Sequence, residues 1–174
     1  FVAGHSLGEY SALCAAGSIS LSDAARLLRI RGDAMQAAVP VGLGGMAALI
    51  GTDPDAAREI AAQAAGDDVL TVANDNGGGQ VVVSGHKAAA ERAIDIAKAR
   101  GVKRGILLPV SAPFHSPLMA PAAERMQTAL ADTVIQPPKV PVVANMVARG
   151  VTDPDEIRRL LVEQVTGTVR WRES

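Results

Sequence analysis

The alternation of hydrophobic and polar positions in the middle of the chain predicts four strands and two helices. Short apolar runs bounded by turn residues are typical of strands, and apolar residues at every third or fourth position are typical of helices. The predicted elements are a strand at 44–51, a helix from Pro54 to about Ala65, strands at 69–73 and 80–84, a helix at 87–100 and a strand at 106–110. This β-α-β-β-α-β order is that of a ferredoxin-like unit.

The flanking parts of the chain predict a second α/β unit around the first. The predicted elements are a short strand at 1–3, a helix at 11–16, a helix at 21–38 begun by Ser20, a helix at 117–131, a strand at 140–144 and a helix opened by Asp153 and Pro154. We therefore expect residues 1–43 and 111–174 to form an α/β core into which residues 44–110 are inserted.

The segment Gly4-His5-Ser6-Leu7-Gly8 has the pattern of a nucleophile elbow. Such a turn joins a strand to a helix and presents a serine hydroxyl beside the unpaired N–H groups at the helix start. We expect both glycines to be required because the tight turn leaves no room for a Cβ on either side of Ser6. The alternative is an ordinary serine N-cap flanked by glycines.

Composition excludes several classes of protein. A hydrophobic content of 48% and a charged content of 20% indicate a soluble globular chain, and a net charge of −1 argues against a nucleic-acid binder. The single cysteine, Cys14, excludes an internal disulfide and favours a reducing, cytoplasmic location. No apolar run is long enough for a membrane span. Because the chain begins at Phe1, three residues before Gly4, we expect its α/β core to be incomplete.

Three histidines are available as a base for Ser6. His115 lies in a proline-rich loop that follows an apolar strand, where α/β sheets place functional residues. The alternative is that it only flanks the next helix. The ring of His5, inside the elbow, should point away from the serine hydroxyl, and a surface role is expected for His86. The three histidines have no metal-ligand spacing, so no metal site is expected.

Arg31 is the third candidate. On a helical wheel it falls within the apolar stripe of the predicted helix at 21–38, whereas Arg29 and Asp33 fall on the opposite face. A buried guanidinium needs a partner, and its planar fork suits a carboxylate. The partner is either a substrate carboxylate or a buried Asp or Glu in a structural ion pair; the side chain reaching water near the helix end is a third possibility.

These residues together favour transfer of an acidic acyl group through Ser6. His115 is the expected general base, and the N–H of Leu7 is one expected oxyanion donor. No second oxyanion donor stands out, nor does an aspartate that would orient the histidine, as in a Ser-His-Asp triad.

With these motifs the chain resembles the malonyl-CoA:acyl carrier protein transacylase family, and more broadly the acyltransferase domains of fatty acid and polyketide synthases. The resemblance extends over essentially the whole chain. It rests on Gly4–Glu9, Arg31–Gln36, Asn74–Gly85, Ser111–Met119, Gln164–Thr166 and Val169–Trp171.

The resemblance implies a hydrolase-like α/β core with a ferredoxin-like subdomain. It implies that Ser6 carries malonyl as an ester, that His115 is the base and that Arg31 binds the malonyl carboxylate. It also implies that the backbone carbonyl near Gln164 orients the histidine. A phenylalanine at position 114, directly before the histidine, is similar to the malonyl-selective members of the family. The acyl group is expected to contact Phe114, His5 and Met35.

The implied partners are malonyl-CoA, as a substrate rather than a resident cofactor, and acyl carrier protein. No nucleic acid, membrane or cofactor is expected to bind. The family's N-terminal loop, which supplies the other oxyanion donor, and a C-terminal glycine-containing segment are not in this sequence. Basic residues in the second half of the inserted unit are either a solvated surface or a site for the acidic carrier protein: Lys87, Arg92, Lys98, Arg100, Lys103 and Arg104.

Three alternatives remain open from the sequence. A serine esterase or thioesterase would share Ser6 and His115 but would have no use for Arg31. A polyketide-synthase acyltransferase domain would share all three residues. A non-enzymatic docking module would need none of them.

Overall fold

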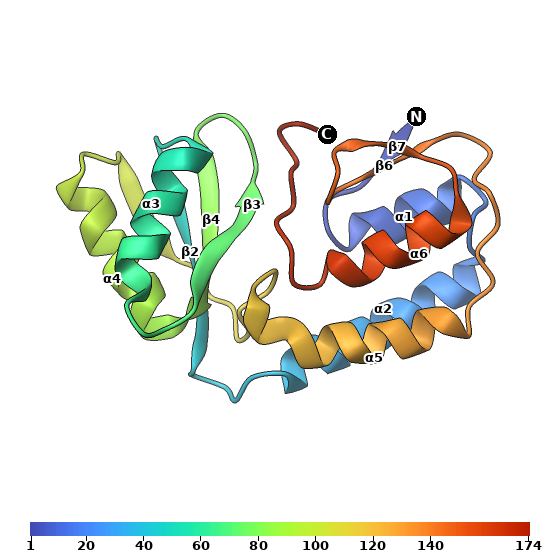
Figure 1. Ribbon diagram of the computed structural model, residues 1–174, viewed down its shortest axis with the longest axis horizontal. Coiled ribbons are helices and arrows are strands. Elements are labelled where there is room, and N and C mark those ends of the chain that lie inside the picture. Colours follow the sequence, from blue (N-terminus) through green and yellow to red (C-terminus); the bar gives the residue numbers. More distant parts are fainter.

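The computed structural model describes residues 1–174, which form seven strands in two sheets, six α-helices and one short 3₁₀ helix (Figure 1). One sheet has four strands and lies beside two helices. The other has three strands and lies among the remaining helices. The chain is thus an α/β protein with two large clusters of buried side chains and a third, smaller one.

The four-stranded sheet is antiparallel, and its strands follow the order β3-β4-β2-β5. The elements of this unit are β2 (Gly44–Ile50), α3 (Pro54–Ala65), β3 (Leu70–Asp75), β4 (Gln80–His86), α4 (Lys87–Ala99) and β5 (Arg104–Leu107). Successive side chains of a strand point to opposite faces. Ala47 and Leu49 accordingly pack with α3 and α4, whereas Met46 and Ala48 pack on the other face, near Phe114.

The three-stranded sheet has the order β1-β6-β7. Strand β1 (Val2–Ala3) is parallel to β6 (Val142–Ala144), which pairs antiparallel with β7 (Arg149–Val151). The helical elements around it are α1 (Gly8–Ala15), α2 (Leu21–Ala37), η1 (Pro117–Met119), α5 (Ala120–Ala131) and α6 (Pro154–Glu163). Helices α2 and α5 run along each other (Figure 1) and contribute to a core cluster of 24 buried residues.

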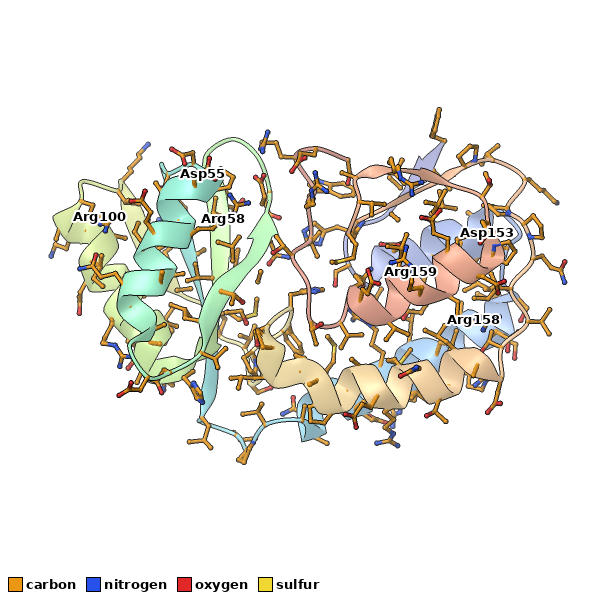
Figure 2. All side chains as sticks on the ribbon, in the orientation of Figure 1. Asp55, Arg58, Arg100, Asp153, Arg158 and Arg159 are labelled. Atoms are coloured by element: carbon orange, nitrogen blue, oxygen red, sulfur yellow. The ribbon has the colours of Figure 1, made fainter.

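Three of the predicted helix starts are confirmed by their capping bonds, whereas the helix predicted at 11–16 begins earlier, at Gly8. The Ser20 side chain accepts a hydrogen bond from the N–H of Asp23 at 3.0 Å, and Asp53 caps α3 through a 2.8 Å bond. Asp153 caps α6 through a 2.7 Å bond from the N–H of Glu156, and Figure 2 shows Asp153 at the start of that helix. Each cap satisfies a backbone donor that the helix itself leaves free.

Some strand boundaries differ from the prediction. The last strand of the four-stranded sheet is Arg104–Leu107 rather than 106–110. The N–H of Leu108 still donates to the carbonyl of Met46 at 2.8 Å, but Pro109 has no N–H and ends the ladder. Strand β7 was not predicted, because three residues are too few for a periodic signal.

The segment after α6 returns to the four-stranded sheet (Figure 1). Val169 donates to the carbonyl of Ala73 at 2.8 Å and accepts from the N–H of Asp75 at 3.0 Å. The Thr168 hydroxyl donates to the carbonyl of Val72 at 2.6 Å. These bonds fix the end of β3 next to the elbow. None of the helices is both long and apolar enough to cross a lipid bilayer.

Candidate active site

The turn around Ser6 has the geometry of a strained elbow. Ser6 adopts a φ of 52°, a left-handed conformation that is uncommon for residues other than glycine. A Cβ added to Gly4 would lie 1.9 Å from the carbonyl oxygen of Gly8, so only glycine fits at position 4. The expectation was wrong for Gly8 itself, because a Cβ there would meet nothing within 4 Å. The crowding comes from the Gly8 carbonyl, which any residue would carry.

Ser6 and His115 form a hydrogen-bonded pair. The Ser6 Oγ and His115 Nε2 atoms are 2.7 Å apart, and His115 Nδ1 lies 2.8 Å from the carbonyl oxygen of Gln164. Because a carbonyl only accepts hydrogen bonds, Nδ1 carries the proton and Nε2 is free to accept the serine proton. The backbone of Gln164 thus occupies the place that an aspartate takes in a Ser-His-Asp triad.

The environment of His115 keeps its imidazole neutral. Burial, and after it the positive charge of Arg31, lower the pKa of His115 to about 4. The hydrogen bond to Gln164 opposes these effects only in part. At neutral pH the imidazole is therefore available to take a proton from Ser6.

Arg31 reaches the same point from helix α2. Arg31 is 7% exposed, and its Nη2 donates to Ser6 Oγ at 3.0 Å and to Gln164 Oε1 at 3.1 Å. Its guanidinium carbon lies 6.0 Å from the centre of the Tyr10 ring, within the range of a cation–π contact. The buried position predicted for Arg31 is confirmed. It makes no direct ion pair with Asp or Glu, and its Nε is buried without a partner.

Two buried residues that sequence reasoning missed connect these groups. Asn145 accepts a hydrogen bond from the N–H of Ser6 at 2.7 Å and donates to the carbonyl of Gly4 at 2.9 Å. Glu9 accepts from the N–H of Asn145 at 3.0 Å and from Gln164 Nε2 at 2.9 Å. Asn145 could have been found from its place directly after a predicted strand. For Glu9, the only signal in the sequence was its position directly after the elbow.

Burial also changes the acidity of Glu9. It raises the pKa of this carboxyl to about 7, against the opposing effects of the hydrogen bonds from Asn145 and Gln164 and the charge of Arg31. Glu9 therefore carries only part of a negative charge at neutral pH.

Ser6, His115 and Arg31 open onto a cavity of about 220 Å³. The other residues that line it are His5, Met35, Met46, Asn74 and Phe114. His5 Nε2 lies 2.9 Å from Asn76 Oδ1, so its ring is held by the turn that follows β3. The N–H of Leu7 has no hydrogen-bond partner in the protein. His86 lies elsewhere, with Nδ1 accepting from the N–H of Val69 at 2.9 Å.

The elbow, the hydrogen-bonded pair of Ser6 and His115, and the buried Arg31 lie together at one cavity. Residues 1–174 match the family model described as the acyl transferase domain, and the chain belongs to that family.

Within this family, the chain is similar to curated relatives of one named type. The malonyl CoA-acyl carrier protein transacylase of Escherichia coli (strain K12) is 48% identical over 99% of this chain and 56% of its own length. That of Bacillus subtilis (strain 168) is 45% identical over 100% of this chain and 55% of its own. The chain therefore spans about half the length of the curated relatives it matches.

Solved structures agree with the fold. The acyl-carrier-protein-S-malonyltransferase of Bartonella henselae superposes with a TM-score of 0.97 at 60% identity, over 99% of this chain and 55% of that one. A malonyl-transacylase in complex with its type II PKS acyl-carrier protein superposes with a TM-score of 0.95 at 43% identity, over 98% of this chain and 55% of that one.

Proposed function

We propose that this chain transfers a malonyl group from coenzyme A to the phosphopantetheine thiol of an acyl carrier protein, in fatty acid biosynthesis. The observation that carries the proposal is the buried guanidinium of Arg31, 3.0 Å from Ser6 Oγ and without a carboxylate partner. A serine hydrolase for neutral esters has no use for such a group. The relatives named above support the same substrate.

The proposed chemistry is a double displacement. As Ser6 Oγ attacks the thioester carbonyl carbon, His115 Nε2 takes the hydroxyl proton, and the carbonyl oxygen becomes an oxyanion near the N–H of Leu7. The carbon–sulfur bond then breaks, and coenzyme A leaves as a thiol with the proton from His115. The carrier-protein thiol reverses these steps, with His115 taking its proton and returning it to Ser6. No resident cofactor is needed.

Arg31 selects the acyl group in this proposal. Its free N–H groups bind the malonyl carboxylate, and Gln164 holds both Arg31 and His115 in place. Phe114 and Met35 line the same cavity, where they restrict the width available to a branched acyl group.

We also propose that residues 44–110 are a ferredoxin-like subdomain inserted into a hydrolase-like core of 1–43 and 111–174. The strand order β3-β4-β2-β5 supports this, because the first strand of the unit then lies between the third and the fourth. The parallel pairing of β1 with β6, next to the elbow, is compatible with one edge of the larger sheet.

The carrier protein is proposed to dock on the basic end of that subdomain. Of its six basic residues, Arg92 pairs with Asp68 at 2.7 Å and Arg100 with Glu59 at 3.0 Å, which leaves neither cation free. Figure 2 shows Arg100 at the outer end of the four-stranded unit. Lys98, Lys103 and Arg104 are exposed and form no ion pair, so they are the better candidates, and the adjacent Lys103 and Arg104 are the two to test. Reversing both charges should raise the KM for carrier protein and leave loading from malonyl-CoA unchanged; an unchanged KM refutes this surface.

Mass spectrometry tests the main proposal. The protein at its full natural length, incubated with malonyl-CoA, should carry a malonyl group on the peptide that contains Ser6, and Ser6→Ala should carry none. Release of the adduct to a thiol should be much faster than to water. The absence of an adduct refutes an acyl-serine mechanism, and faster hydrolysis than transfer favours a thioesterase.

A further inference from the structure

Glu9 is a buried titratable group that the proposed chemistry does not use. It is 3% exposed and lies in the first turn of α1, directly after the elbow. Its Oε2 accepts two hydrogen bonds, from Gln164 Nε2 at 2.9 Å and from the N–H of Asn145 at 3.0 Å. A buried carboxyl costs free energy, so a position that needed only packing would favour an apolar residue.

The hydrogen bonds of Gln164 fix the orientation of its side-chain amide. Arg31 can only donate, so the amide oxygen must face its Nη2, at 3.1 Å. The amide nitrogen then faces two acceptors, the carbonyl of Ser6 at 3.1 Å and the carboxyl of Glu9 at 2.9 Å. Both N–H groups and the oxygen are therefore occupied, and Glu9 accepts at Oε2 whether or not its other oxygen is protonated.

This arrangement places one amide group between Glu9 and Arg31. A direct ion pair would occupy the guanidinium with a protein carboxylate. With Gln164 between them, the arginine is held beside Ser6 by a polarised amide, and its remaining N–H groups have no partner in the protein.

We propose that Glu9 is a positioning residue: it fixes the amide of Gln164 as a hydrogen-bond acceptor for Arg31 and so holds the guanidinium ready for a substrate carboxylate. The expected effect of this positioning is selectivity for carboxylated acyl groups, and that effect rests on the proposed function. It assigns no contact between Glu9 and the substrate.

Two variants separate this role from simple packing. Glu9→Gln keeps an acceptor oxygen, whereas Glu9→Met has a similar size and no acceptor. The measured quantity is the ratio of kcat/KM for loading malonyl-CoA and acetyl-CoA onto Ser6. Glu9→Met should lower this ratio about tenfold, the effect of losing one hydrogen bond to a charged network. Glu9→Gln should keep it within about twofold of the parent value. Glu124→Gln, an exposed carboxyl on α5, is the matched control.

Acetyl loading reports whether Ser6 and His115 are intact, because the acetyl group has no carboxylate for Arg31. A folded Glu9→Met variant with the parent ratio overturns the proposal. So does a Glu9→Gln variant whose ratio falls as far as that of Glu9→Met.

A measurement that needs no activity distinguishes this inference from the proposed function. The side-chain amide protons of Gln164, observed by NMR, should be protected from exchange in the parent and in Glu9→Gln, and one should lose protection in Glu9→Met. Equal protection in all three proteins overturns the positioning role even where loading is normal. Failure of the parent to load either acyl group refutes only the proposed function.

Discussion

Replacement of Arg31 by alanine is expected to abolish the preference for carboxylated acyl groups. Nη1 of Arg31 donates to no protein atom, and acylation of Ser6 weakens the hydrogen bond from Nη2 to its Oγ, so that Nη1 and Nη2 together can bind one carboxylate. A bidentate carboxylate pair makes two charge-assisted hydrogen bonds, each worth about 1.5–3 kcal/mol. Their loss, about 3–6 kcal/mol, corresponds to a fall in malonyl loading of about 10²–10⁴-fold.

Acetyl loading should fall much less in the same variant. Loading of acetyl depends on Arg31 only through the 3.0 Å hydrogen bond from Arg31 to Ser6 Oγ, which the substitution removes. One such bond accounts for about tenfold. The ratio of malonyl to acetyl loading should therefore fall by at least about tenfold.

The assay is the rate of acylation of Ser6 from each thioester, followed by intact-protein mass spectrometry. Arg29→Ala is the matched control, because Arg29 lies on the same helix, its side chain is 83% exposed and it pairs only with Asp33, at 3.2 Å. A folded Arg31→Ala variant with the parent malonyl-to-acetyl ratio would refute the assignment of Arg31 to the substrate carboxylate.

Two further predictions concern the elbow and the buried carboxyl. Gly4→Ala should destabilise the fold by about 3 kcal/mol because its Cβ meets the Gly8 carbonyl at 1.9 Å, whereas Gly8→Ala should change stability by less than about 1 kcal/mol; equal thermal shifts would contradict this. The folded-state pKa of Glu9, about 7, lies above its ordinary value, so ionising it costs stability as pH rises from about 4.5 to 7. Glu9→Gln should therefore gain stability relative to the parent, by up to about 3 kcal/mol, between pH 5 and pH 8. Denaturant unfolding at the two pH values measures this, and a difference independent of pH would refute it.

The sequence alone was sufficient to predict features that depend on one residue with a single plausible structural role. Arg31 interrupts an apolar stripe, and its burial followed from helical periodicity alone. Ser20, Asp53 and Asp153 precede helices and have few other uses there, so the helix starts were predicted correctly.

Features that depend on long-range contacts could not be predicted in the same way. Glu9 and Asn145 are 136 positions apart, and only the folded chain brings them together. The carbonyl of Gln164 carries no side-chain signal, so its contact with His115 was expected from the family resemblance and not from the residue itself. The crowding at the elbow was assigned to the wrong atom of Gly8, because periodicity does not describe the path of the backbone.

The arginine that we assign to the substrate also acts on the base. Burial lowers the pKa of His115 most, and the charge of Arg31 contributes to the resulting value of about 4. A malonyl carboxylate on Arg31 compensates that charge, so binding the correct substrate should raise the pKa of His115 and strengthen it as a base. An acetyl group leaves the charge uncompensated.

The pH dependence of acylation tests this coupling. Because protonated His115 cannot accept the Ser6 proton, the rate falls as pH drops through the pKa of His115 in the enzyme–substrate complex. The midpoint for kcat should therefore lie at higher pH with malonyl-CoA than with acetyl-CoA, and Arg31→Met should remove the difference. Identical midpoints for the two substrates in the parent protein would show that selection of the acyl group and activation of Ser6 are independent, although both use groups within 3.0 Å of the same hydroxyl.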